Sequence, residues 1–383
     1  MRLDFAIMAT AIACSATLLT ASWPASAGYP GFDGRIAFTT DRDGDNEIYS
    51  MNPDGSDETN LTQNAASDFD AAWSPDGTMI AFASDRDGFN DWDVFVMDAD
   101  GGHPVNLTND PALDWNPTWS PDGTQIAFTS YRAGGGEIFV MDADGANVVQ
   151  LTSNTFYDRH PKWSPDGARI AFETYRDDNW EIFVMDADGT SEIRITDNLE
   201  YDFEPDWSPD GAFIAWRTGL FDGVGDIAVI SSDGLGAITN LTNDPAYDRE
   251  PAWSPDGSRI AFATVDGANF DVVVMDADGT NPITLTGNAG NDYDPDWQPS
   301  QAQWTVDVTK AGAGSGIVRS RPAGIRCGSD CTQDYPEGIT VGLRATASAG
   351  STFAGWSGAC SGVGDCFLTI DGPVELTATF SKP

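Results

Sequence analysis

Short apolar runs recur along most of the chain at a nearly constant spacing. Ile-Ala-Phe or Ile-Ala-Trp begins at Ile36, Ile80, Ile126, Ile170, Ile214 and Ile260. The alternation of large and small side chains predicts a β-strand packed on both faces. A tryptophan stands seven residues before each of the last five runs, at Trp73, Trp119, Trp163, Trp207 and Trp253, and a further copy stands at Trp297. The repeat length of about 44 residues is typical of a β-propeller blade.

One copy, from Asp158 to Thr196, shows the four strands that we expect in each blade. The first strand ends at Trp163, and the Ser-Pro-Asp-Gly that follows it has the composition of a tight turn. Further strands are predicted at 170–172, 181–185 and 194–196, and an Asp-Ala-Asp-Gly hairpin joins the last two.

The two ends of the repeats complement each other. The chain enters at Ile36 with the second strand of a blade, and it leaves at Trp297 with a first strand. Pairing them would complete six blades and cover two open sheet edges. We therefore predict an all-β protein in which residues 28–303 form a six-bladed β-propeller closed by pairing of its N- and C-terminal strands. A small disulfide-containing β domain would follow at 304–383.

The repeat motifs resemble those of a known family. Trp-Ser-Pro-Asp-Gly, Ile-Ala-Phe, Asp-Arg-Asp-Gly and Glu-Ile-Phe-Val-Met-Asp-Ala-Asp-Gly look like the TolB-type WD-like propeller repeat, over roughly residues 33–300. Propellers of this type serve as binding platforms, as gating domains of dipeptidyl peptidases and as lyases, so the resemblance implies the fold more narrowly than the function. TolB proteins carry an α/β domain before the propeller, and only a few residues separate Ala27 from the first blade here. We therefore expect neither a Tol–Pal role nor an intact serine peptidase, since no hydrolase domain follows.

The N-terminus and the charge indicate an exported protein. Residues 1–27 have Arg2, an apolar stretch and Ala25-Ser26-Ala27, which is the pattern of a secretory signal peptide; a retained anchor or a lipoprotein at Cys14 are the alternatives. The net charge of −41 disfavours nucleic acid and favours cations or basic partners, although an acidic surface also serves solubility alone. We expect a monomer in the periplasm, on the cell surface or outside the cell, without a membrane span after signal cleavage.

Two sets of polar residues precede the blade tryptophans and define the candidate site. The first ring, five residues before each Trp, is Asp68, Asp114, Asp158, Asp202, Asp248 and Asp292. The second ring, three residues before each Trp, is Asp70, Asn116, His160, Glu204, Glu250 and Asp294. Because the first ring is Asp in every blade, we expect it to cap the incoming loops. The second ring varies, and we predict that it forms a funnel that binds a basic peptide group or Ca²⁺.

Other candidate chemistry is sparse. Asp41, Asp43, Asp45 and Glu47 resemble a calcium loop without EF-hand spacing; the alternative is a hairpin loop in which Arg42 or Arg86 pairs with Glu47 or Asp93. His103 is expected in an exposed turn. His160 is the one other histidine, and no zinc-ligand array or nucleophile elbow is present in the sequence.

Composition shifts near Trp304, and the segment beyond it carries four of the five cysteines. Strands are predicted at 304–308, 316–320, 339–346, 366–370 and 374–380. Cys327-Gly-Ser-Asp-Cys331, Gly350-Ser-Thr-Phe-Ala-Gly-Trp356 and Cys360…Cys366 resemble the divergent internalin-type B-repeat module of exported bacterial proteins, which implies a spacer or attachment role. Four cysteines allow three pairings, and we expect Cys327–Cys331 and Cys360–Cys366. Trp356 is expected in the core, with an exposed ligand platform as the alternative.

Together these patterns predict an exported, non-enzymatic binding or scaffold protein of the cell envelope or surface, with a protein or peptide partner at an acidic funnel. No catalytic residue and no organic cofactor are expected. The alternative is a metal-assisted polysaccharide lyase or hydrolase that uses His160 and the funnel carboxylates.

Overall fold

The structure is a computed structural model, and it describes residues 34–88, 92–176, 178–219, 225–265, 267–299, 303–321, 325–327, 331–336, 340–370 and 372–382. The predicted signal segment 1–27 lies outside these residues. All regular elements of the described part are β-strands, arranged in eight four-stranded sheets. No helix that could cross a membrane is found among the described residues.

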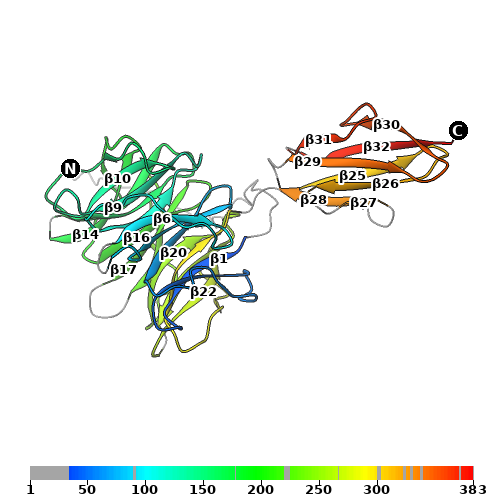
Figure 1. The fold of residues 1–383 in the computed structure, drawn as a ribbon. Coiled ribbons are helices and arrows are strands. Elements are labelled where there is room, and N and C mark those ends of the chain that lie inside the picture. The colour runs from blue at the N-terminus through cyan, green and yellow to red at the C-terminus, as the bar shows by residue number, and fades with distance from the viewer. Residues whose placement is uncertain are drawn as a thin grey trace, which may run out of the picture.

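Six of the sheets follow one another along the repeats, as Figure 1 shows for strands β1 to β24. The first sheet combines β1 (Ile36–Thr40), β2 (Glu47–Met51) and β3 (Thr59–Asn60) with β24 (Asp292–Trp297). The second and third sheets contain β4 (Asp68–Trp73), β5 (Met79–Ser84), β6 (Asp93–Asp98), β7 (Val105–Asn106), β8 (Asp114–Trp119), β9 (Gln125–Ser130), β10 (Glu137–Asp142) and β11 (Val149–Gln150). The remaining three contain β12 (Asp158–Trp163), β13 (Arg169–Arg176), β14 (Asn179–Asp186), β15 (Ile193–Arg194), β16 (Tyr201–Trp207), β17 (Phe213–Gly219), β18 (Asp226–Ser231), β19 (Thr239–Asn240), β20 (Tyr247–Trp253), β21 (Arg259–Val265), β22 (Phe270–Asp276) and β23 (Ile283–Thr284).

Within a sheet the strands are antiparallel and the register follows from the turns. In the fourth sheet Trp163 faces Ile170, and Ile170 faces Met185. The predicted turn after Trp163 is present, with Gly167 N–H donating to the Ser164 carbonyl at 2.8 Å. The fourth strand of each sheet has only two residues, which is shorter than the sequence suggested. A short outer strand leaves little open edge for pairing with another chain.

The predicted pairing between the two ends of the repeats is present. Strand β24 pairs antiparallel with β1, and Ile36 faces Trp297. The Gln298 N–H donates to the Arg35 carbonyl at 2.8 Å and extends this pairing by one step. One hydrophobic cluster joins Ile36, Phe38 and Met51 of the first sheet to residues of β20, β21 and β22, so the first and last sheets of the repeats pack on each other.

The C-terminal domain is a sandwich of two further sheets. One contains β25 (Gln303–Ala311), β28 (Thr332–Pro336), β30 (Thr352–Gly358) and β32 (Val374–Ser381), and the other contains β26 (Gly316–Arg321), β27 (Arg326–Cys327), β29 (Thr340–Ala347) and β31 (Cys366–Thr369). Both predicted disulfides, Cys327–Cys331 and Cys360–Cys366, are present. Trp356 is buried in the core between the sheets, as expected, and its Nε1–H donates to the Gly364 carbonyl at 2.9 Å.

The sequence missed β27, β28 and β30. The segment of β28, Thr-Gln-Asp-Tyr-Pro, is mostly polar, and β30 contains Gly355 and Gly358. Both compositions are depleted in strands. Pairing with β25 and β32, respectively, overrides these local preferences.

Candidate functional site

The six residues of the second ring share one unusual backbone conformation. Each has a positive φ, between 50° and 56°. Each also lies where the register between the first and second strands of its sheet shifts, which marks a β-bulge. A bulge redirects a side chain away from the regular alternation of the strand. A non-glycine residue in the left-handed region costs of order 1–3 kcal/mol, and such strain clusters at functional sites.

The local sequence explains the bulge. A proline follows the second-ring residue in five of the six strands, at Pro117, Pro161, Pro205, Pro251 and Pro295, and Ala71 takes this place in β4. Proline has no N–H to donate to the ladder, so a strand interior that contains it is interrupted there. The proline therefore accounts for the irregular register in five sheets, while β4 has the same bulge and a positive φ at Asp70 with Ala71 in this place.

The redirected side chains meet in one cavity. All six second-ring residues line it, each from a different sheet. At the mouth the cavity has a volume of about 380 Å³ and is also lined by Phe69, Trp115, Arg159, Arg249 and Tyr293. It continues into a narrower part of about 70 Å³ that is lined by the prolines, Lys162 and Asp296. We call this cavity the funnel. The structure thus brings the predicted residues together, and their role in binding stays a prediction.

The second ring also links neighbouring sheets by hydrogen bonds. The Asn116 N–H donates to Asp70 Oδ2 at 3.0 Å, and the Glu250 N–H donates to Glu204 Oε2 at 3.0 Å. The Asp294 N–H donates to Glu250 Oε2 at 2.8 Å. In each case the backbone of one turned residue is held by the side chain of the preceding sheet. The carboxylates therefore stabilise the arrangement of the sheets as well as line the funnel.

At two other positions the acceptor comes from the second strand of the preceding sheet. Thr129 Oγ1 accepts from the His160 N–H at 3.2 Å, and Glu173 Oε2 accepts from the Glu204 N–H at 2.9 Å. These acceptors stand three residues after the repeated Ile, where the six blades have Thr39, Ala83, Thr129, Glu173, Arg217 and Ala263. This position is not part of the shared repeat pattern. Its signal is the charged residue in the middle of an otherwise apolar strand.

Glu173 is the centre of an ion-pair cluster. Its carboxylate is fully buried and lies 3.0 Å from Arg159 and 3.2 Å from His160 Nδ1. Burial alone would raise the pKa of Glu173, but the positive charges of His160 and Arg159 lower this pKa to about 2. The carboxylate in turn raises the pKa of His160 against the effect of burial. His160 is therefore a charged partner of a carboxylate and is not arranged as a free base.

The negative charge of the funnel is uneven. Glu204 pairs with Arg217 and Glu250 pairs with Arg249, both at 3.2 Å. No arginine of the described residues forms such a pair with Asp70 or Asp294. Burial raises the pKa of Asp70 to about 6, and burial with the nearby Asp70 carboxylate raises that of Asp294 to about 7. At these two residues the positive charges of His160, Lys162 and Arg249 therefore offset only part of the effect of burial and of the neighbouring carboxylates.

The narrow part of the funnel contains one cation. Lys162 is the only lysine between residues 34 and 309, and it lies close enough to Asp206 and Asp296 for them to raise its pKa against the effect of burial. These two aspartates are held by backbone groups: Trp253 N–H donates to Asp206 and Trp73 N–H donates to Asp296, each at 2.8 Å. Lys162 therefore balances part of the negative charge below the second ring.

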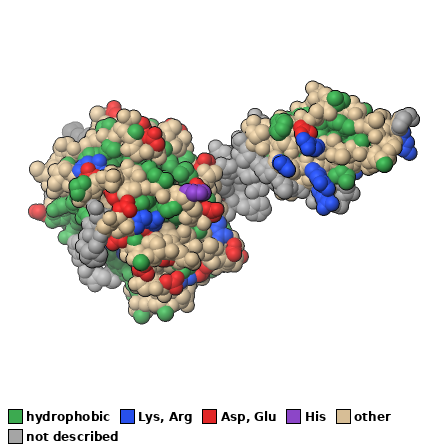
Figure 2. Space-filling model, in the orientation of Figure 1, with side chains coloured by type: hydrophobic (Ala, Val, Ile, Leu, Met, Phe, Trp, Pro, Cys, Tyr) green, Lys and Arg blue, Asp and Glu red, His purple; other side chains and the backbone are tan. Residues whose placement is uncertain are grey.

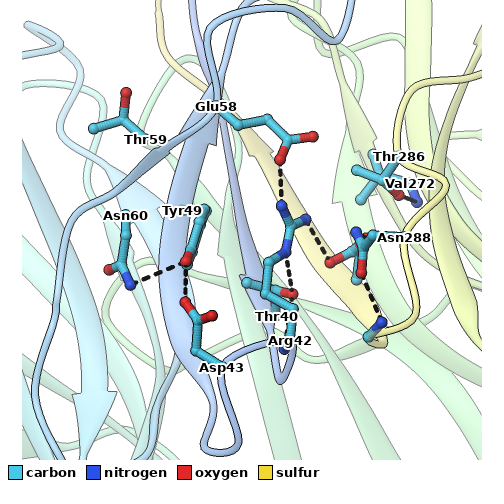
Figure 3. A network of polar contacts seen from close by, with 12 residues as sticks. Thr40, Arg42, Asp43, Tyr49, Glu58, Thr59, Asn60, Val272, Thr286 and Asn288 are labelled. Atoms are coloured by element: carbon cyan, nitrogen blue, oxygen red, sulfur yellow. Dashed lines mark hydrogen bonds and ion pairs between the residues drawn. The ribbon is translucent and has the colours of Figure 1, made fainter.

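The first ring has the structural role that the sequence suggested. All six aspartates are buried, and an asparagine of the incoming loop donates to several of them, as Asn64 does to Asp68 at 2.6 Å. An arginine of the loop after the second strand completes the contact in four sheets; Arg86 lies 2.8 Å from Asp68 and Arg42 lies 2.9 Å from Asp292. The predicted pairing of Arg42 or Arg86 with Glu47 or Asp93 is therefore wrong. Arg42 contacts Glu58 and Asp292 instead (Figure 3).

Three acidic residues of the predicted calcium loop accept hydrogen bonds from protein groups, and metal binding there stays untested. Asp41 accepts hydrogen bonds from the backbone and side chain of Asn291, each at 2.7 Å, and Asp43 accepts from the Tyr49 hydroxyl (Figure 3). Glu47 is buried and accepts from the Asn64 N–H at 3.0 Å. The oxygens of Asp41, Asp43 and Glu47 thus serve separate protein donors, and with Asp45 they do not gather around a common point. No group of three or more His, Cys, Asp or Glu residues suited to a metal occurs in the described part of the chain. His103 is exposed in its turn, as expected.

The repeated four-stranded sheets and the sandwich that follows define a propeller-type protein with an added β domain. Residues 89–162 and 155–242 match the TolB beta propeller domain family, and residues 306–383 match the Divergent InlB B-repeat domain family. The resemblance found in the sequence is thereby confirmed: the chain carries TolB-type propeller repeats and a divergent InlB B-repeat domain.

Individual relatives agree with this assignment. Over 62 residues, 16% of this chain, the sequence is 42% identical to the Tol-Pal system protein TolB of Desulfosudis oleivorans, and this stretch spans 14% of that protein. The structure resembles TolB from Acinetobacter baumannii with a TM-score of 0.62 and 24% identity, covering 71% of this chain and 68% of that one. It resembles putative TolB from Agrobacterium tumefaciens with a TM-score of 0.56 and 24% identity, covering 67% and 90%. At these identities the structural likeness shows the fold alone.

Proposed function

We propose that this chain is an exported, non-enzymatic binding protein whose six sheets form a closed ring around the funnel. The β1–β24 pairing and the packing between the first and last sheets support the ring. Two disulfides suit an oxidising compartment outside the cytoplasm. The similarity to TolB, a protein of the Tol-Pal system by name, supports a role in the cell envelope.

The observation that carries the proposal is the set of six left-handed residues turned toward one axis. A purely structural propeller could keep regular strands there at lower conformational cost. The strained backbone directs the carboxylates of the second ring into one cavity, where their like charges lie close together. These residues are Asp70, Glu204, Glu250 and Asp294. Such an arrangement favours a positively charged ligand, because each carboxylate raises the free energy of its charged neighbours.

The mouth of the funnel suggests what kind of cation enters. Phe69 and Trp115 line it beside Asp70, with ring centroids 6.4 Å apart. Lysine and arginine side chains combine an apolar stem with a charged end, and a cation is attracted to an aromatic face. A basic side chain of a protein partner would place its stem against these rings and its charge between Asp70 and Asp294. The ligand class that we propose is therefore a basic peptide segment.

The test measures binding of an oligolysine peptide to the mature protein by calorimetry. The double variant Asp70→Asn with Asp294→Asn should bind at least about tenfold more weakly, because charge-assisted hydrogen bonds contribute about 1.5–3 kcal/mol each. Asparagine keeps an acceptor for the Asn116 N–H, so the fold is preserved.

The matched control removes the same charge outside the funnel. Asp54 and Asp233 lie in exposed hairpin turns of two blades, and the variant Asp54→Asn with Asp233→Asn should bind as the wild type does. Equal losses in both double variants would mean that the peptide responds to net charge alone and would refute a funnel site.

The alternative of a metal-assisted lyase or hydrolase gains no support. His160, the only histidine in the funnel, is committed to Glu173, and the described residues hold no group suited to a metal.

A further inference from the structure

The outer face of one C-terminal sheet carries charges unlike those of the rest of the chain. In residues 304–383 the Lys and Arg residues number six and the Asp and Glu residues seven, so nearly all of the net charge of −41 belongs to the propeller. Figure 2 shows Lys and Arg side chains gathered on the visible face of the C-terminal domain. Four of its arginines, Arg319, Arg321, Arg326 and Arg344, are exposed.

The strand register places these arginines side by side. Arg319 on β26 faces Arg326 on β27 and Arg344 on β29. Cross-strand neighbours have Cβ atoms about 4.5–5.5 Å apart. Arg321 lies two residues along β26 on the same face, about 7 Å from Arg319. The opposite face of these strands, with Val318, Val341 and Leu343, is buried in the core, so the arginine side chains all point outward.

Three of the four guanidinium groups have no acidic partner among the described residues. Arg344 pairs with Asp365, with nitrogen–oxygen distances of 2.6 and 3.0 Å. Arg319, Arg321 and Arg326 make no hydrogen bond or ion pair with any described residue. Like charges directly opposite each other destabilise a sheet. A sheet that holds such a cluster, without partners among the described residues, is therefore suited to an anionic ligand.

An aromatic ring lies beside the arginines. Phe367 on β31 is 70% exposed, although it is apolar and lies next to a strand partner. It faces Gly342, which in turn faces Arg321. A Cβ at Gly342 would come within 2.9 Å of the Phe367 ring, so the ring lies over the glycine backbone. The glycine thus lets the ring lie flat against the sheet and present its other face to solvent.

We propose that this face, formed by Arg319, Arg321, Arg326 and Phe367, binds an acidic polysaccharide of uronic acid units. The planar guanidinium fork matches a carboxylate in two hydrogen bonds. The apolar C–H face of a pyranose ring packs on an exposed aromatic ring, as in other mostly apolar ligand sites with a few placed polar groups. Charge complementarity selects the occupant, because this cluster of exposed arginines is a local exception on a strongly acidic protein. This site is separate from the funnel and does not depend on it.

The experiment measures binding of β-1,4-linked oligomannuronate to the full chain by calorimetry at low ionic strength. The neutral counterpart, β-1,4-manno-oligosaccharide, should not bind measurably. The variant Arg319→Gln with Arg321→Gln should weaken oligomannuronate binding about tenfold, because it removes two of the guanidinium groups that would pair with the carboxylates. Lys382→Gln removes a positive charge from the same domain outside this face and should change the affinity less than twofold.

A second pair of measurements separates a sugar site from a general anion site. Phe367→Ala should weaken oligomannuronate binding about fivefold and leave binding of inorganic polyphosphate unchanged. The proposal would be overturned if the arginine variant weakened binding of both ligands equally while Phe367→Ala changed neither affinity. It would also be overturned if Lys382→Gln weakened oligomannuronate binding as much as the arginine variant does. If the arginine variant lost self-association in sedimentation experiments and kept its sugar binding, the face would be an interface with a second copy of the chain. That result would also overturn the proposal. An unchanged thermal transition shows that each variant folds, and the funnel variant Asp70→Asn with Asp294→Asn should bind oligomannuronate normally.

Discussion

At the scale of single residues, Glu173 combines several roles behind the funnel wall. It is buried, it pairs with Arg159 and His160, and it accepts the Glu204 N–H across the boundary between two sheets. Burying a charge is costly unless partners surround it. The cluster is therefore stabilising only as a complete set, and loss of the one carboxylate leaves two cations without a counter-charge.

Glu173→Gln should lower the free energy of unfolding at pH 7 by about 3–5 kcal/mol, the range for removing one partner of a buried ion pair. Because the native pKa of Glu173 is lowered to about 2, its contribution is present above the unfolded pKa near 4.5 and is lost as the pH falls through 2. Urea unfolding at pH 7 and pH 3 measures both effects, and the difference between wild type and variant should shrink at the lower pH.

The control is Glu192→Gln, which removes the partly exposed carboxylate that pairs with Arg176. A surface ion pair contributes at most about 1 kcal/mol. A loss for Glu173→Gln no larger than that of the control would contradict the role given to the buried cluster.

At the scale of elements, β24 is the last strand of the repeats and pairs with β1, the first described strand. It supplies the inner strand of the first sheet, and Trp297 packs in the cluster that joins the first and last sheets. The Trp297 Nε1–H also donates to the Ala252 carbonyl at 3.1 Å. Without this strand, β1 would expose a row of backbone groups and the apolar side chains beside them.

A chain that ends at Asn291 should therefore aggregate or lose its cooperative thermal transition, followed by tryptophan fluorescence. A chain that ends at Pro299 keeps β24 and lacks the same C-terminal domain, and it should melt cooperatively. Similar behaviour of the two truncated chains would show that the β1–β24 pairing is not required for the fold.

Much of the element plan could be read from the sequence because the repeat is regular. The Trp, the turn and the Ile-Ala-Phe strand recur, so a strand seen in one blade predicts its equivalent in the others. The same regularity located the second ring. The repeat pattern did not reveal Glu173 and Arg217. Their position is Thr, Ala, Glu or Arg in different blades, so it does not belong to the shared motif. The partners predicted for Arg42 and Arg86 were also wrong. Both arginines pair with first-ring aspartates on other strands, and not with an acidic residue of their own hairpin.

At the scale of the whole molecule, buried carboxyl groups dominate the response to pH. Burial raises the pKa of Asp70, Asp114, Asp202, Asp206 and Asp248 to about 6, and that of Asp294 to about 7. Each of these groups binds protons more tightly in the folded state than in the unfolded state, where the pKa is near 3.8. Stability must then decrease as the pH rises through the interval between these values.

We expect the melting temperature to be highest near pH 4–5 and to fall as the pH rises to about 7. The net charge of −41 adds to this trend through repulsion. Thermal scans across pH 3–8 at low and moderate salt test the prediction, and salt should raise the melting temperature most at neutral pH. A maximum at pH 7 or above would contradict it.

The bulge at the turned residues, five of which precede a proline, has a consequence for how such proteins diversify. Proline and the bulge govern where the preceding side chain points, whatever that side chain is. Aspartate, asparagine, histidine and glutamate all occupy the position with nearly the same φ. Six neighbouring sites can therefore exchange chemistry one at a time without rebuilding the scaffold, which makes this ring a natural place to redesign ligand preference.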